Sequence, residues 1–221
     1  MLLTYLIILT ATNILAFVSS NEISSLRNEL KELREQILRD KATDTYTRWG
    51  RTTCPTGATT IYVGFAAGAH YTHSGGAANY VCLSKKPTFD YHSVQPRYYT
   101  YIYGAEYETH DSIWHQFVNH DVPCVVCQVP RTSVIMVPGR NDCPDNFKLE
   151  YAGYLMAGHK SHAAASEYVC VDKDPTEDDY SNGGNADGKL FYFVRAGCGA
   201  LKCLPYRRGK SITCAVCSFS P

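Results

Sequence analysis

The sequence predicts an all-β head of two duplicated disulfide-rich units, preceded by a short α-helical coiled coil. Three observations predict this fold class: cysteines that recur in register, β-branched and aromatic runs bounded by turn residues, and a heptad pattern near the N-terminus. The chain has 221 residues, 10 cysteines and a formal net charge of zero. The balanced charge argues against nucleic acid as a partner, and the cysteine content is typical of a secreted protein.

Residues 1–20 predict a signal peptide. They carry no charge, and two apolar runs, Leu2–Leu9 and Ile14–Val18, are followed by small residues. The usual basic n-region is absent, so the prediction rests on the apolar core and the small-residue exit. The alternative is a transmembrane anchor, but polar residues interrupt the stretch and no basic stop-transfer cluster follows it. We therefore expect a secreted protein of the extracellular space or matrix, with no membrane span after cleavage.

Residues 21–41 predict a coiled-coil oligomerisation stalk. Apolar residues recur at alternating steps of three and four, with glutamate at the g positions and arginine or lysine at the e positions, as in a parallel coiled coil. The alternative is an amphipathic helix docked on its own head, which usually needs a wider apolar face. The mixed seam does not distinguish a dimer from a trimer. It consists of Ile23, Leu26, Leu30, Leu33 and Ile37.

After a polar linker, expected at residues 42–47, the chain repeats itself. Four cysteines recur 88 to 90 residues later, and the first of each half is followed by proline. We therefore predict a first β unit at 48–132 and a second at 133–221. The first half holds Cys54, Cys82, Cys124 and Cys127; the second holds Cys143, Cys170, Cys214 and Cys217, and adds Cys198 and Cys203.

Short β-branched or aromatic runs predict the strands of the head. They are Thr60–Val63, Tyr98–Tyr103, Ser133–Val137, Lys189–Val194 and Ile212–Val216. The two Cys-x-x-Cys pairs do not indicate zinc, because they lie about ninety residues apart in a chain that is expected to be exported. They also lack the βαβ context of a thioredoxin-type pair. Each pair is expected on one strand, with its two sulfurs directed to different partners.

Several segments of the head resemble a known family. The segments Pro123–Cys127, Gln128–Pro130, Val134–Met136, Cys143-Pro144, Tyr151–Tyr154 and Thr213–Cys217 resemble the duplicated non-collagenous C-terminal domain of type IV collagen. Two further segments, Trp49–Pro55 and Tyr71–Leu83, are more similar to the same domain in the short-chain (spongin-type) collagens of sponges and their invertebrate relatives. The similarity covers residues 46–221.

The resemblance implies a disulfide pattern in which each half pairs its first cysteine with its last and its second with its next-to-last. It also implies a trimer. The chain departs from collagen because the Gly-X-Y repeat is absent, and the methionine and lysine that cross-link collagen hexamers cannot be placed on it. The implied pairs are Cys54–Cys127, Cys82–Cys124, Cys143–Cys217, Cys170–Cys214 and a local Cys198–Cys203.

Two patterns are weak metal candidates. His70 and His73 recur as His159 and His162, but two imidazoles fall short of a full zinc set and duplication alone explains the repeat. The acidic loop from residue 172 to residue 187, which includes Asp172 and Asp174, has oxygen ligands for calcium but does not fit the EF-hand template. We expect the histidines to form turns and the carboxylates to lie in a solvated loop. No cofactor is predicted.

The function expected from these observations is binding, without enzyme activity. No nucleophile-elbow or phosphate-binding motif occurs, and every cysteine has a disulfide role. We expect a secreted, oligomeric extracellular-matrix-type protein whose partners are itself, as a parallel homo-oligomer, and matrix proteins or glycans. The alternative is a lectin-like recognition oligomer of innate immunity that binds glycans. Residues 83–123 and 171–213 differ most between the halves and are the expected binding surface.

Overall fold

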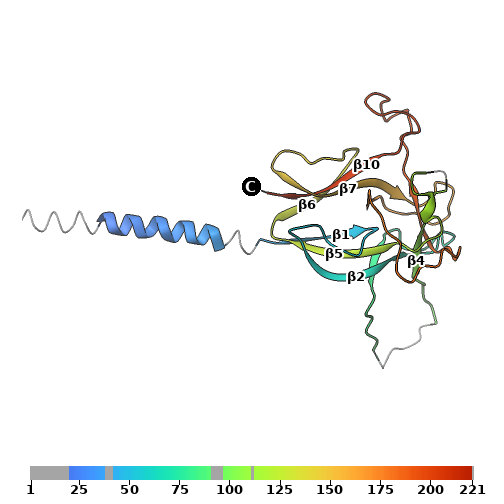
Figure 1. The fold of residues 1–221 in the computed structure, drawn as a ribbon, viewed down its shortest axis with the longest axis horizontal. Helices are drawn as coiled ribbons and strands as arrows, with labels where there is room; N and C mark the ends of the chain where they lie inside the picture. The colour runs from blue at the N-terminus through green and yellow to red at the C-terminus, as the bar shows by residue number, and fades with distance from the viewer. Residues whose placement is uncertain (1–19, 38–41, 91–96, 111, 221) are drawn as a thin grey trace, which may run out of the picture. The chain divides into compact units, whose positions relative to one another are not determined.

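A computed structural model of the chain describes residues 20–37, 42–90, 97–110 and 112–220. The first of these segments is a helix over residues 20–37 (Figure 1). All five residues of the predicted seam lie on it and are between 46% and 63% exposed. The predicted signal peptide lies outside the described residues, apart from its last residue. In the described part of the chain, no helix is long and apolar enough to span a lipid bilayer.

The head is mostly β, with ten strands and one short 3₁₀ helix, η1, among its described residues (Figure 1). The first half contains β1 Asp44–Trp49, β2 Thr59–Gly68, β3 Val81–Ser84, β4 Tyr103–Tyr107, η1 His115–Phe117 and β5 Pro123–Val129. The second half contains β6 Thr132–Pro138, β7 Phe147–Ala157, β8 Val169–Asp172, β9 Lys189–Phe193 and β10 Thr213–Phe219. The helix at residues 20–37 and the mostly β head therefore agree with the secondary structure that the sequence predicts.

Two predictions of local structure are wrong. The linker expected at 42–47 is strand from Asp44 onward, because Tyr46 is buried in the core and the whole of β1 pairs with β5. The strand expected at Tyr98–Tyr103 begins only at Tyr103. The aromatic side chains before it, such as Tyr98 and Tyr99, are exposed and find no buried face against which a strand could pack.

All ten strands belong to one mixed sheet. Its order is β6-β10-β7-β8-β1-β5-β2-β4-β9, and β3 pairs with β2 outside this path. A further pairing of β9 with β7 closes a circuit of seven strands. Two parallel contacts join the halves, β1 with β8 and β4 with β9. The predicted boundary at residues 132 and 133 therefore coincides with the start of β6 but does not separate two sheets.

Within each half the antiparallel pairings follow one pattern. In the first half they are β1 with β5, β5 with β2, β2 with β3 and β2 with β4. In the second half they are β6 with β10, β10 with β7, β7 with β8 and β7 with β9. The strands that carry repeated cysteines thus have matching antiparallel neighbours in the two halves, although β8 has an additional parallel contact with β1.

Five disulfides cross-link the head, and every cysteine among the described residues is paired. The pairing is the one that the resemblance implies. Cys124 and Cys127 of β5 bond to two different partners, as expected for residues that face opposite ways on a strand. The bonds are Cys54–Cys127, Cys82–Cys124, Cys143–Cys217, Cys170–Cys214 and Cys198–Cys203. Such a framework is typical of proteins of an oxidising, extracellular compartment.

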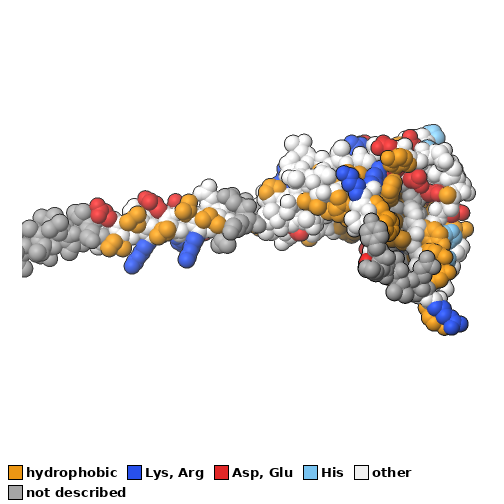
Figure 2. All heavy atoms as spheres, turned by 90° about the horizontal axis from the view of Figure 1, so that it is seen from below, with side chains coloured by type: hydrophobic (Ala, Val, Ile, Leu, Met, Phe, Trp, Pro, Cys, Tyr) orange, Lys and Arg blue, Asp and Glu red, His pale blue; other side chains and the backbone are white. Residues whose placement is uncertain are grey.

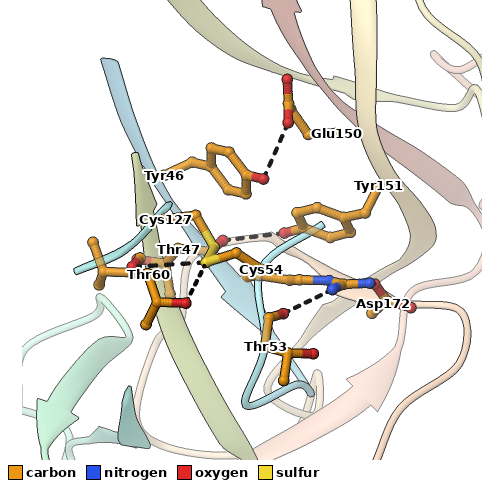
Figure 3. The surroundings of a disulfide bond; sticks show 11 residues. Tyr46, Thr47, Thr53, Cys54, Thr60, Cys127, Glu150, Tyr151 and Asp172 are labelled. Atoms are coloured by element: carbon orange, nitrogen blue, oxygen red, sulfur yellow. Dashed lines mark hydrogen bonds and ion pairs between the residues drawn. A yellow bond between two sulfur atoms is a disulfide. The ribbon is translucent and has the colours of Figure 1, made fainter. Parts of the chain in front are cut away.

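The two halves meet around β1, where polar side chains are satisfied across the boundary (Figure 3). The Tyr46 hydroxyl donates to Glu150 over 3.2 Å, and the Tyr151 hydroxyl donates to the carbonyl of Thr47 over 3.1 Å. Arg48 forms an ion pair with the buried Asp172. Buried polar groups of this kind are costly unless they are paired, so these contacts fix how the halves join.

Candidate functional site

A cavity of about 870 Å³ opens where the ends of β4, β7 and β9 lie together. Parallel pairing of Tyr107 with Phe191 and antiparallel pairing of Ala157 with Tyr192 bring these ends to one place. The residues that come after each strand then form the walls. This volume lies within the range of small-ligand pockets in proteins. The lining includes Glu108, His110, His159, Lys160, His162, Ser166, Tyr168, Tyr192 and Arg195.

The repeated His-x-x-His motifs form two turns with the same hydrogen bonds. In the first turn, the amide of His73 donates to the carbonyl of His70 over 2.9 Å, and the amide of Thr72 donates to Nδ1 of His70 over 3.3 Å. The amides of His162 and Ser161 make the equivalent bonds to His159, over 3.0 and 3.3 Å. The first histidine of each turn therefore uses Nδ1 to close the turn.

The two turns lie side by side because a buried lysine and a tyrosine connect them. Nζ of Lys189 donates to the carbonyls of Ala78 and Ala165, over 3.2 and 2.9 Å. Tyr71 accepts a backbone hydrogen bond from Ala164, and its ring lies 4.6 Å from that of His162. Only the second turn, at His159 and His162, lines the cavity.

Burial shifts the pKa values of three groups in the cavity wall. It raises the pKa of Glu108, which is hydrogen-bonded to His110 over 3.1 Å. It raises the pKa of Tyr192 to about 12, with a further contribution from the charge of Glu108. It lowers the pKa of His162, and the neighbouring His159 lowers it further. In the described part of the chain, Nδ1 of His162 is buried without a hydrogen-bond partner.

The other metal candidates have different roles in the structure. Asp172 is 2% exposed and bound to Arg48 at 2.6 Å, so its carboxylate is already neutralised. Asp174 points outward, with its side chain 74% exposed. Among the residues that the structure describes, no group of three or more metal-binding side chains is close enough to hold an ion. Neither the two histidine turns nor Asp172 and Asp174 form such a group.

The interpretation of the cavity rests on its own residues. No protein-family model matches the chain. Among the described residues, the cavity combines aromatic rings, imidazoles, two exposed cationic side chains at Lys160 and Arg195, and a single carboxylate at Glu108 that already has a partner. These groups can pack against flat or apolar surfaces, donate hydrogen bonds and attract negative charge.

Sequence reasoning located part of this site. It singled out His159 and His162 through their repeat, and it expected binding in the segments that contain Glu108 and Tyr192. Arg195 lies in the same segment as Tyr192, but neither Arg195 nor Lys160 was singled out, because isolated exposed cations carry no pattern in a sequence. Their position in the chain is the feature that could have indicated them. They come soon after β7 and β9, and residues that follow the ends of neighbouring strands can converge on one site.

Proposed function

We propose that the protein is a secreted, self-associating protein of the extracellular-matrix type that acts by binding, without catalysis, through its disulfide-rich head. The observation that carries the proposal is the exposed heptad seam on a helix that precedes a head with five disulfides. Exposed apolar residues at strict a and d positions favour association with a second helix of the same kind. Several heads on one stalk would then bind repeated targets with increased avidity.

The head is proposed to be a duplicated domain of the type IV collagen C-terminal kind, similar to that of the short-chain collagens. The disulfide pairs and the matching strand neighbours of the two halves support this proposal. A close approach shared by Gly64 and Gly153 supports it as well. A Cβ at Gly64 would meet the carbonyl oxygen of Leu83, and a Cβ at Gly153 would meet that of Val171. By this resemblance the oligomer is a trimer.

The stalk is tested by replacing Leu26, Leu30 and Leu33 with glutamine in the full chain. We expect sedimentation velocity to show a smaller species, while the near-ultraviolet circular dichroism of the head is unchanged. The matched control replaces Asn28, Lys31 and Glu35, which lie on the same helix outside the seam, with glutamine. An oligomer that survives the leucine replacements would assign assembly to the head and contradict the role of the stalk.

A second candidate function is lectin-like recognition of glycans. The cavity at the ends of β4, β7 and β9 favours it, because aromatic rings and hydrogen-bonding side chains line one concave site. Sugar rings present C–H groups that pack on aromatic faces and hydroxyls that exchange hydrogen bonds with polar side chains. The two candidates are compatible, since a matrix protein can bind glycans through an oligomeric head.

A further inference from the structure

A continuous row of rings, here called the aromatic stripe, runs from an exposed segment of the first half to the cavity. Tyr99 and Tyr101 lie 5.0 Å apart, and Tyr103 comes next, at 6.0 Å from Tyr101 and 5.0 Å from His70. Successive rings of the stripe are in contact. Its nine members are Tyr99, Tyr101, Tyr103, His73, His70, Tyr71, His162, His159 and Tyr192.

The stripe is accessible along its length. Tyr99 and Tyr101 are 64% and 57% exposed, and His159 is exposed at the cavity. The rings between them are half-buried. Figure 2 shows hydrophobic and histidine side chains exposed together on one part of the head. Exposed rings in such a row are unusual for a stable surface and are typical of a surface that is covered by a ligand.

The stripe ends in a cavity whose described lining residues include more basic than acidic side chains. Lys160 and Arg195 are exposed on its wall, and His159 and His162 line the same cavity. The single acidic side chain among the described lining residues, Glu108, is hydrogen-bonded to His110. An anionic group entering the cavity would therefore meet cationic or hydrogen-bond-donating partners, and the arginine and lysine would bind it with charge-assisted hydrogen bonds.

We propose that the aromatic stripe and the cavity bind one acidic oligosaccharide, with sugar rings packed along the stripe and a sulfate or carboxylate group held in the cavity by Lys160 and Arg195. This inference rests on the second candidate function and specifies its ligand class. A neutral glycan would supply no anionic partner to the two cations of the cavity. A single-stranded nucleic acid could also stack on rings, so the test includes one as an alternative ligand.

Protonation of His162, in the cavity wall, adjusts the affinity for such a ligand. The groups that surround His162 are His159, Tyr71 and Tyr192, with the charge of Asp187 acting from nearby. Burial and His159 lower the pKa of His162, so at neutral pH the ring is uncharged. Acidification charges His162 and adds a donor for the anion. Binding therefore becomes tighter as the pH falls.

The test measures binding of three probes to the full chain by isothermal titration calorimetry. A heparin-derived hexasaccharide supplies sugar rings with sulfates, a chitin hexasaccharide supplies neutral rings, and an oligo(dT) of matched charge supplies a stacking polyanion. We expect the heparin fragment to bind at least about tenfold more tightly than either of the others. Absence of heparin binding overturns the proposal. Equal binding of the chitin hexasaccharide also overturns it, because the acidic groups would then be irrelevant. Equal binding of oligo(dT) overturns it because the sugar chain would then be irrelevant.

Two pairs of variants separate the cavity from the stripe. Lys160→Gln with Arg195→Gln should weaken heparin binding at least about tenfold, whereas Lys148→Gln with Arg208→Gln, two exposed cations outside the cavity, should not. Unchanged binding by the first pair overturns the proposal.

For the stripe, Tyr99→Ala with Tyr101→Ala should weaken binding by a factor of about three or more. The control is Phe89→Ala with Tyr98→Ala, which removes exposed rings outside the stripe. Equal effects of the two pairs would contradict a role for the stripe.

The result is independent of self-association. The same titration on the chain with Leu26, Leu30 and Leu33 replaced by glutamine should give one hexasaccharide per chain with unchanged intrinsic affinity. If that variant is monomeric and binds, both proposals hold. If the chain self-associates but does not bind the hexasaccharide, the proposed ligand is wrong. If the unmodified chain binds the hexasaccharide but never self-associates, the proposed role of the stalk is wrong.

Discussion

The two halves of the head share their buried framework and differ in the segments that pack against it. Both halves pair their strands in the same pattern, close loops of 73 and 74 residues with equivalent disulfides, and form the same histidine turn. Each turn also packs against a tyrosine, the first against Tyr103 and the second against Tyr192, but only the turn at His159 lines the cavity. The comparison teaches that the framework positions both turns and the tyrosine beside each, while the other segments around a turn decide whether it lines a cavity.

The strongest test of this equivalence removes one long-loop disulfide from each half. Replacing Cys54 and Cys127 by serine, or Cys143 and Cys217 by serine, should lower the free energy of unfolding by about 4 kcal/mol each, because loops of 73 and 74 residues lose nearly the same chain entropy. Chemical denaturation of the two variants checks the prediction. A difference above about 1.5 kcal/mol would show that the halves are energetically unlike despite their matching pairings.

The shared glycines give the next largest effect. Gly153→Ala would place a methyl group against the backbone carbonyl of Val171, and Gly64→Ala would place one 2.5 Å from that of Leu83. We expect losses of stability of about 3 and 2 kcal/mol, with the larger loss in the second half because its approach is closer. Thermal unfolding provides the measurement. Gly104→Ala is the control, since nothing lies near its Cβ position, and an equal loss there would remove the steric explanation.

The smallest effect concerns a buried carboxylate that distinguishes β4 from β9. Glu106 is 2% exposed and pairs in register with Leu190, and burial, with the charges of Asp121 and Asp187, raises its pKa to about 7. A raised folded-state pKa means that the folded protein binds the proton more tightly than the unfolded chain, so stability falls as the pH rises from about 4.5 to about 7.

Glu106→Gln should therefore stabilise the protein by about 2 kcal/mol at pH 8 and by little at pH 4.5. The glutamine oxygen can still accept the backbone hydrogen bond of Ala186. Denaturation curves of both proteins at the two pH values measure the difference. A benefit that is independent of pH would assign the effect to packing and contradict the raised pKa.

The sequence predicted those parts of the fold that a local pattern determines. The spacing of the cysteines, through the resemblance, implied all five bonds, and β-branched runs located β2, β6 and β10. It failed at β1, because Asp44, Thr45 and Thr47 are polar and only their pairing with β5 makes them strand. It failed at the cavity because Lys160 and Arg195 reach the same cavity only through the pairing of β7 with β9, which no local pattern specifies.

The position of β1 has a mechanical consequence. The chain enters the head at Asp44 and runs at once between β5 and β8, with six residue pairs to β5 alone. A pull on the N-terminal side along this strand loads its hydrogen bonds in shear, so that many must break together, whereas a strand peeled from an edge loses them one by one. Tension delivered through the N-terminal segment would thus be carried by a strand that is paired along its whole length.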